Sequence, residues 1–234
     1  MHNRFPARFC HHVTCALLFG LFLQFATTAD AQSAVNNAAN DTASDKAISK
    51  ITDPATVSAV KQAQQNGNPV VALHTNLGTM HLELYPEKSP KSVENFVKYV
   101  QDNFYDGTIF HRVIEGFMIQ GGGLDLRLEK KKTRDPVLNE ADNGLRNEKF
   151  TIAMARTGAP HSATAQFFIN TADNDFLNHK AKEASGWGYA VIGRMIGGKR
   201  IAEWMSKAPT GPAGPFPSDV PVTPMVIEKA TVLQ

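Results

Sequence analysis

The sequence predicts a mainly β domain, a closed antiparallel barrel capped by two α-helices. Three observations lead to this prediction. The apolar runs are numerous and short, and Gly, Pro, Asn or Asp separates them. Residues 79–85 alternate apolar and polar side chains, which is the pattern of a half-buried strand. Only two stretches, 89–105 and 198–207, have a clear helical spacing, so predicted strands outnumber helices.

The first 31 residues do not fit this domain. Arg4 and Arg8 precede an apolar run over 13–26, and Ala29-Asp30-Ala31 follows it. A basic start, a short apolar centre and an A-x-A site are typical of a secretory signal peptide. The run is also shorter than a membrane span requires. We therefore expect residues 1–31 to be removed, the rest to act in the periplasm, and no stable membrane insertion after cleavage.

Residues 32–66 are predicted to form a flexible polar extension, because 32–65 contain no Phe, Tyr, Trp, Leu or Met. One short helix is a further possibility there, with Asp53 as its N-cap and Pro54 at its first position. The folded domain is then expected over 67–234.

From Pro69 onward, the pattern can be followed element by element. Ser89-Pro90 opens a predicted helix with Ser89 as its cap, and Asp106-Gly107 ends it. A turn at 76–78 separates the first two strands, and the second helix is expected over 198–207. The predicted strands are 70–73, 79–85, 109–114, 117–120, 150–155, 167–170, 189–195 and 225–233.

Composition excludes several classes of function. The net charge is +2, which gives no reason to expect nucleic acid as a partner. The two cysteines, Cys10 and Cys15, lie in the leader, so the mature chain has no thiol for a disulfide, a nucleophile or a metal. The remaining histidines lack paired spacing, and we predict no metal and no cofactor. The common hydrolase motifs are missing too, which disfavours a hydrolase.

Two short motifs have structural explanations. Gly121-Gly122-Gly123 lacks the Lys-Ser/Thr of a phosphate loop, so close backbone packing is the better interpretation. The basic run 130–134 is bracketed by Glu129 and Asp135, which favours a solvated loop over a binding patch.

The most informative segment is Phe110-His111-Arg112-Val113-Ile114-Glu115-Gly116-Phe117-Met118-Ile119-Gln120-Gly121-Gly122. An arginine within an apolar strand is uncommon, because Arg is rarely buried without a partner. Strand alternation places Phe110 and Arg112 on one face. Taken alone, Arg112 fits a surface ion pair. His111 is expected to be a hydrogen-bonded strand residue and not a base.

Together with Met154-Ala155-Arg156, Gln166-Phe167-Phe168-Ile169-Asn170 and Phe176-Leu177, this segment resembles the cyclophilin family of peptidyl-prolyl cis-trans isomerases. The resemblance covers about 69–234. Residues 139–145 and 188–191 are similar to the bacterial periplasmic branch, peptidyl-prolyl isomerase A.

The resemblance implies an eight-stranded barrel with a substrate groove on its outer surface. It implies that Arg112 is the catalytic residue and that Gln120 holds it in place. The proline pocket would comprise Phe117, Met118, Phe168 and Leu177, and the peptide backbone would lie along Ala155, Arg156 and Gln166. Phe176 and Tyr189 replace the Trp and His of many family members, and Arg156 replaces Asn. These differences bear on cyclosporin affinity and fine specificity.

The implied reaction suits these residue types. Resonance makes the peptide bond planar, and the barrier to its rotation is ~18–20 kcal/mol. A fixed guanidinium can donate to the nitrogen lone pair that appears when resonance is lost. The implied partners are proline-containing segments of folding exported proteins, and the enzyme is expected to be monomeric. The alternative is a non-catalytic cyclophilin-like chaperone that only holds such segments.

Overall fold

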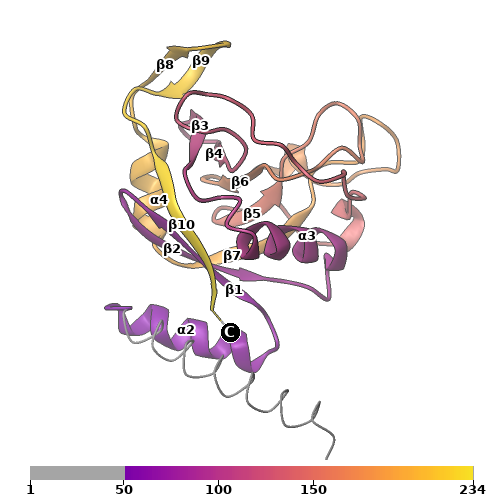
Figure 1. Cartoon of the computed structure of the whole chain (residues 1–234). Helices are drawn as coiled ribbons and strands as arrows, with labels where there is room; N and C mark the ends of the chain where they lie inside the picture. Colours follow the sequence, from indigo (N-terminus) through magenta and orange to yellow (C-terminus); the bar gives the residue numbers. More distant parts are fainter. Residues whose placement is uncertain (1–50, 234) are drawn as a thin grey trace, which may run out of the picture. The chain divides into compact units, whose positions relative to one another are not determined.

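The computed structural model describes residues 51–233. Eight antiparallel strands form a closed barrel in the order β1-β10-β3-β4-β6-β5-β7-β2 (Figure 1). The predicted barrel is therefore confirmed. Its strands are β1 (Val70–Thr75), β2 (Gly78–Leu84), β3 (Thr108–Ile114), β4 (Met118–Gly121), β5 (Thr151–Met154), β6 (Phe167–Asn170), β7 (Val191–Gly197) and β10 (Val226–Leu233).

Helices α3 (Pro90–Gln101) and α4 (Lys199–Ser206) complete the main core. Phe96 of α3 and Met205 of α4 are both fully buried in the same hydrophobic cluster as the barrel interior. Aromatic side chains fill much of it: the rings of Phe96 and Phe167 meet edge to face at 5.4 Å. The buried Tyr105 hydroxyl is satisfied by donating to the Ala165 carbonyl.

Helix α3 begins at Pro90 after Ser89 as predicted, but its capping bond and its end differ from the prediction. The Ser89 hydroxyl makes no capping bond to the helix and donates instead to the Val191 carbonyl. The Glu140 carboxylate accepts from the backbone N–H groups of Lys91 and Ser92 at 3.1 and 2.8 Å, so it satisfies the orphan donors of the first turn. The helix also ends at Gln101, before Asp106-Gly107, because Asn103 adopts a left-handed backbone (φ 54°).

The described residues contain three α-helices, one more than the two predicted to cap the barrel. Helix α2 (Pro54–Gln65) is the short helix that Asp53 and Pro54 suggested, and the Asp53 carboxylate caps it. Its Val60 and Ala63 are buried against Val70 and Ala72 of β1. The end of the predicted flexible extension is thus a helix packed on the barrel. The remainder, 32–50, and the leader lie outside the described residues.

Helix α2 also affects the burial of strand β2. Met80, Leu82 and Leu84 point into the core as predicted, but His81 and Glu83 on the other face are buried as well. Helix α2 contacts β2, and the guanidinium of Arg194 pairs with Glu83 at 3.0 Å. The expected half-buried strand is therefore covered on both faces.

Strands β8 (Thr210–Ala213) and β9 (Phe216–Pro221) form a separate two-stranded hairpin that the sequence pattern did not predict. The segment 209–221 contains five prolines, which normally argue against strands. A two-stranded ribbon tolerates them because each of its strands has an edge that needs no ladder donor. In Figure 1 the hairpin extends beyond β3, and β9 contacts that strand.

Candidate functional site

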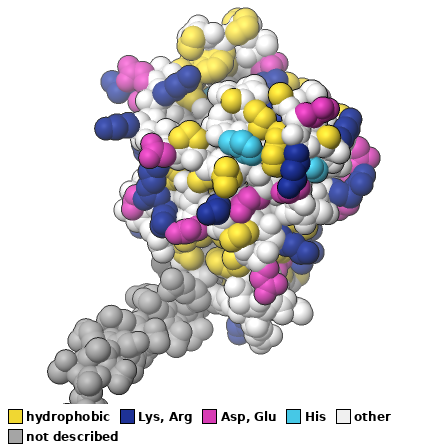
Figure 2. Space-filling model, turned by 90° about the vertical axis from the view of Figure 1, so that its right-hand side faces the viewer, with side chains coloured by type: hydrophobic (Ala, Val, Ile, Leu, Met, Phe, Trp, Pro, Cys, Tyr) yellow, Lys and Arg dark blue, Asp and Glu magenta, His cyan; other side chains and the backbone are white. Residues whose placement is uncertain are grey.

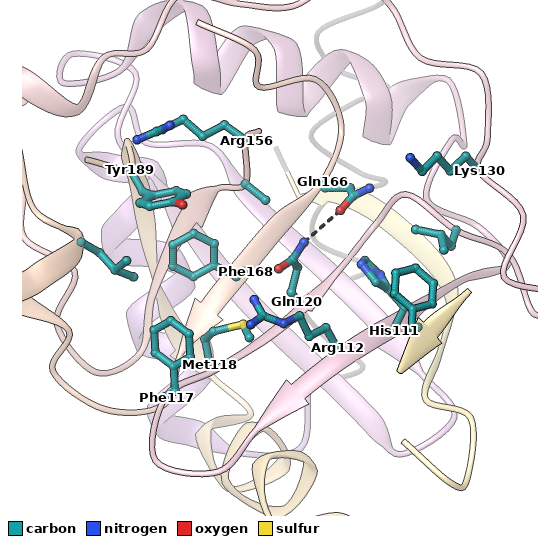
Figure 3. A pocket seen from close by; sticks show the side chains of 14 residues that line it. His111, Arg112, Phe117, Met118, Gln120, Lys130, Arg156, Gln166, Phe168 and Tyr189 are labelled. Atoms are coloured by element: carbon teal, nitrogen blue, oxygen red, sulfur yellow. Dashed lines mark hydrogen bonds between the residues drawn. The ribbon is translucent and has the colours of Figure 1, made fainter. Parts of the chain in front are cut away.

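A pocket of about 350 Å³ opens beside β3, β4 and β6. It brings together nine of the ten predicted substrate-binding residues and the predicted catalytic residue (Figure 3). These are Arg112, Phe117, Met118, Gln120, Ala155, Arg156, Gln166, Phe168, Leu177 and Tyr189. Segments distant in the sequence thus converge on one groove, although the role of each residue stays a prediction.

A β-bulge in β3 determines how Arg112 enters the groove. Phe110 pairs with Gly121 and Arg112 pairs with Gln120, so His111 is an extra residue in the ladder. The prediction that Phe110 and Arg112 share a face is therefore wrong. Phe110 points into the barrel core, whereas Arg112 faces the groove. The bulge also turns His111 toward the pocket, so two consecutive residues line it.

Strand register then aligns the groove floor. Arg112 lies opposite Gln120 in the β3–β4 ladder, and Gln120 lies opposite Phe168 in the β4–β6 ladder. Cross-strand neighbours on one face of a sheet lie ~4.5–5.5 Å apart at their Cβ atoms. A charge, an amide and an aromatic ring therefore follow one another across three strands. Figure 3 shows the Arg112 side chain reaching along this floor toward Met118.

No hydrogen bond between Gln120 and the Arg112 guanidinium is recorded among the described residues, so the predicted role of Gln120 stays a prediction. The Gln120 amide donates to the side-chain carbonyl of Gln166 at 2.9 Å. Among residues 51–233, the ion pair recorded for Arg112 is with Asp219 of β9, whose Oδ2 lies 3.6 Å from Nε. The β8–β9 hairpin, and not β4, therefore supplies the charged neighbour.

The apolar part of the groove forms its own cluster, distinct from the barrel core. Met118, Phe168 and Leu177 are buried there with Ala153 and Val191. Phe117, Ala155 and Tyr189 are partly buried against them. The Phe168 and Tyr189 rings meet edge to face at 5.6 Å, which fixes the wall of a small apolar cavity. Such a cavity suits a compact apolar ring.

Phe176 is the predicted residue that does not line the pocket. Its side chain is 65% exposed, and its ring packs 5.4 Å from that of Phe117. It follows Asp175 in a short 3-10 helix (Asp175–Leu177), whose last residue does line the pocket. Phe176 therefore lies at the rim.

Arg156 is held both by its own loop and by the segment that contains Gly188 and Tyr189. Its Nε donates to the Gly188 carbonyl and its Nη1 to the Thr157 carbonyl, both at 2.9 Å. The guanidinium also lies 4.6 Å from the centre of the Tyr189 ring, a cation–π contact. Arg156 and Tyr189 therefore brace each other at the groove wall. This pairing explains how both differences from the usual family residues fit together.

The glycine motif has a local purpose in this geometry. A Cβ on Gly123 would lie 2.4 Å from Cγ of Gln166, and one on Gly122 would lie 2.6 Å from the Phe167 ring. Close packing, as predicted, is confirmed. The absence of a side chain at Gly123 gives Gln166 the space in which it accepts from Gln120.

Four pocket residues were not predicted: His111, Leu124, Lys130 and Phe216. Burial lowers the pKa of His111 to about 4, with a backbone hydrogen bond to Ile109 opposing the shift, so the ring is neutral at pH 7. Its Nδ1 has no hydrogen-bond partner among the described residues, which corrects part of the expected strand role. The ring lies 5.7 Å from that of Phe216.

The basic run divides between two roles. Lys130 lines the pocket, whereas the Lys131 ammonium donates to the carbonyls of Phe104 and Asp106. Arg134 pairs with Asp102 at the end of α3. The predicted solvated loop is therefore only partly correct, since this segment is tied to the helix.

Among residues 51–233, no group of three or more His, Cys, Asp or Glu side chains is arranged to bind a metal ion. Within the same range, no helix has the length and apolarity to cross a membrane. On the face shown in Figure 2, acidic and basic side chains are interspersed.

Comparison with known proteins gives one family. The model of the family described as cyclophilin type peptidyl-prolyl cis-trans isomerase/CLD matches residues 70–232. Peptidyl-prolyl cis-trans isomerase cyp18 of Streptomyces antibioticus is 55% identical over 163 residues, which cover 70% of this chain and 98% of that protein. Peptidyl-prolyl cis-trans isomerase B of Escherichia coli (strain K12) is 48% identical over 163 residues, with coverage of 70% and 99%.

A solved structure agrees at the level of the fold. The crystal structure of a Cryptosporidium parvum cyclophilin type peptidyl-prolyl cis-trans isomerase superposes with a TM-score of 0.56 at 24% identity, covering 70% of this chain and 97% of that one. The region that matches the family model, 70–232, includes all the barrel strands except the last residue of β10, Leu233, and every predicted groove residue. On these grounds, the chain belongs to the cyclophilin-type peptidyl-prolyl cis-trans isomerase family.

Proposed function

We propose that this protein catalyses rotation about X-Pro peptide bonds, with Arg112 as its catalytic residue. The observation that carries the proposal is the position of one guanidinium beside an apolar cavity formed by Phe117, Met118, Phe168 and Leu177. A second cyclophilin-type structure from Cryptosporidium parvum was determined in the presence of the dipeptide Ala-Pro. We extend that class of ligand to this groove.

Catalysis then follows from differential binding. The cavity holds the proline ring while the carbonyl on its N-terminal side rotates. At the twisted transition state the proline nitrogen regains its lone pair, to which the Arg112 guanidinium donates. A planar ground-state amide offers no such acceptor, so the hydrogen bond lowers the barrier without strengthening ground-state binding. The donor is always charged and is fixed before the reaction, so no proton transfer is required.

Neighbouring groups supply binding and not chemistry. The amides of Gln120 and Gln166 offer donors and acceptors for a bound peptide backbone. The neutral His111 keeps a second positive charge away from Arg112 at pH 7. Uncatalysed exchange of the X-Pro bond takes ~10–100 s at room temperature, so even a modest catalyst is measurable.

The direct test is turnover of a short X-Pro peptide, followed by exchange NMR. The purified protein is expected to accelerate exchange at substoichiometric concentration. A proline-limited refolding reaction gives the second readout: a catalyst shortens the slow phase when substrate is in excess, whereas a binding module acts only stoichiometrically. Failure to accelerate either reaction would reject the proposal in favour of the non-catalytic alternative.

We also propose that the substrates are exported proteins folding in the periplasm. The support is the leader pattern in residues 1–31, with cleavage expected after Ala31. Intact-mass measurement of protein recovered from a periplasmic fraction is expected to show Gln32 at the N-terminus and no thiol. A form that retains Cys15 would contradict this localisation.

A further inference from the structure

We propose that Asp219 of strand β9 is a positioning residue that holds the Arg112 guanidinium in the orientation needed for isomerisation. The inference rests on the proposed function and adds a part of the chain, the β8–β9 hairpin, to the active-site machinery. It also reassigns to Asp219 the role that family resemblance gave to Gln120.

The β8–β9 hairpin lies beside the groove. β8 and β9 are not part of the barrel, yet β9 contacts β3 along the groove. Phe216 of β9 lines the pocket with its ring 5.7 Å from that of His111. Asp219, three residues on, reaches the next residue of β3, Arg112. One short strand therefore contacts both side chains that the β3 bulge turns outward.

Packing and proline residues restrain the hairpin. At its turn, a Cβ on Gly214 would lie 2.8 Å from Cδ1 of Leu128, so the turn packs directly on that side chain. Pro217 and Pro221 restrict the φ angles on either side of Asp219. The carboxylate is thus presented by a restrained segment.

The backbone of Asp219 has an unusual conformation. Its φ of 67° is left-handed, a conformation that Asp and Asn adopt more readily than other non-glycine residues. This conformation interrupts the regular extended backbone of β9 at the residue that faces Arg112. The local strain belongs to the residue that makes the contact, as is often found where a side chain must be aimed.

Asp219 is the charged partner recorded for Arg112 among residues 51–233. Its Nε faces Oδ2 of Asp219 at 3.6 Å, and both side chains are partly exposed, at 44% and 33%. The Gln120 amide nitrogen donates to Gln166, and no hydrogen bond between Gln120 and Arg112 is recorded in the described part of the chain. A carboxylate on the Nε side restrains the side chain and leaves the terminal Nη groups for the substrate nitrogen. An exposed pair of this kind contributes little to stability, so removing it should affect catalysis more than the melting temperature.

The test is a double-mutant cycle in the peptide isomerase assay. Asp219→Asn is the main variant because Asn keeps the shape and tolerates the left-handed backbone. We expect kcat to fall about fivefold, the factor that corresponds to ~1 kcal/mol, with KM changed less than about twofold. Asp219→Glu should recover part of the loss. The matched control is Glu203→Gln, which removes a surface ion pair with Lys149 away from the groove.

Coupling separates positioning from a structural effect. In an Arg112→Ala background, Asp219→Asn should cause no further loss, because the residue to be positioned is gone. An additive loss would overturn the proposal by showing that Asp219 acts through the hairpin. Normal kcat in Asp219→Asn would overturn it as well. Asp219→Gly, which accepts the same φ without a carboxylate, provides a second variant if the first does not fold.

The proposed function and this inference can fail separately. An inactive wild-type protein rejects the function. An active wild type with an inactive Arg112→Ala and a fully active Asp219→Asn rejects only the positioning role. Salt gives an independent readout: raising the ionic strength should narrow the difference between wild type and Asp219→Asn, because the pair is exposed to solvent.

Discussion

The side-chain amide of Gln120 donates to the side-chain carbonyl of Gln166 over 2.9 Å, and Gly123 leaves the space that Gln166 occupies. The two amides come from different segments of the chain and lie beside Arg112 in the groove floor. Their mutual hydrogen bond fixes the direction of both, so each offers its remaining groups to a bound peptide in a defined orientation.

We therefore expect Gly123→Ala to reduce catalysis. Its Cβ would lie 2.4 Å from Gln166 Cγ, so the Gln166 side chain must move and its bond with Gln120 is lost. A several-fold rise in KM for an X-Pro peptide is the expected result. Gly158→Ala is the control, since a Cβ there meets nothing within 4 Å. Equal kinetics in the two variants would contradict this account.

Arg112→Ala is expected to lower turnover by ~10²–10³, equivalent to ~2.7–4 kcal/mol of transition-state stabilisation, by analogy with the loss of one oxyanion donor. The side chain is 44% exposed, so the melting temperature should change little. Circular dichroism and peptide turnover measured on the same sample check both statements. A folded variant with near-normal turnover would reject Arg112 as the catalytic residue.

His111 should make stability depend on pH. Burial lowers the pKa of His111 to about 4 in the folded state, whereas an unfolded histidine has its ordinary pKa of 6.5. The unfolded state therefore binds more protons between these values, and the free energy of unfolding should fall as pH drops from about 6.5 toward 4. The His111 contribution amounts to up to ~3 kcal/mol.

Urea unfolding of wild type and His111→Gln across this pH range isolates that contribution. Gln fills similar space but does not titrate, so the variant should show a flatter profile. Burial also lowers the pKa of His81, but this residue is present in both proteins and so does not affect the comparison. Identical pH profiles would show that His111 is not buried in its neutral form.

Phe176 should limit cyclosporin sensitivity. Family members that bind the drug tightly generally have Trp at this position, and Phe lacks the indole donor. The exposed Phe176 ring lies at the rim of the pocket, where a bound macrocycle would meet it. We expect weak inhibition of the wild type and a gain of about tenfold or more in Phe176→Trp. Nanomolar inhibition of the wild type would contradict this prediction.

The sequence was sufficient to predict the barrel and most of the residues that line the groove. Alternation in β2 and helical spacing in α3 follow from local pattern, and the groove residues follow from a long, specific motif. Local pattern did not predict the β3 bulge, because one extra residue in a ladder leaves no mark in apolar periodicity. It therefore placed Phe110 and Arg112 on the same face.

Contacts between distant segments account for the other differences. Ser89 is a residue type that favours the N-cap position, but its hydroxyl does not cap helix α3. The carboxylate of Glu140, about fifty residues later, accepts from the N–H groups of the first turn instead. The β8–β9 hairpin is rich in proline, so neither its strands nor the approach of Asp219 to Arg112 could be predicted from spacing. Both depend on tertiary packing that overrides local preference.

Helix α2 changes where the folded unit begins. Its Val60 and Ala63 cover Val70 and Ala72, and removing the helix would leave these strand side chains in water. A recombinant domain that begins at residue 67 would therefore expose an apolar, aggregation-prone patch on the barrel. One that begins before Asp53 would keep this patch buried under helix α2. For this protein, the boundary useful for expression lies upstream of the boundary at which similarity to its family begins.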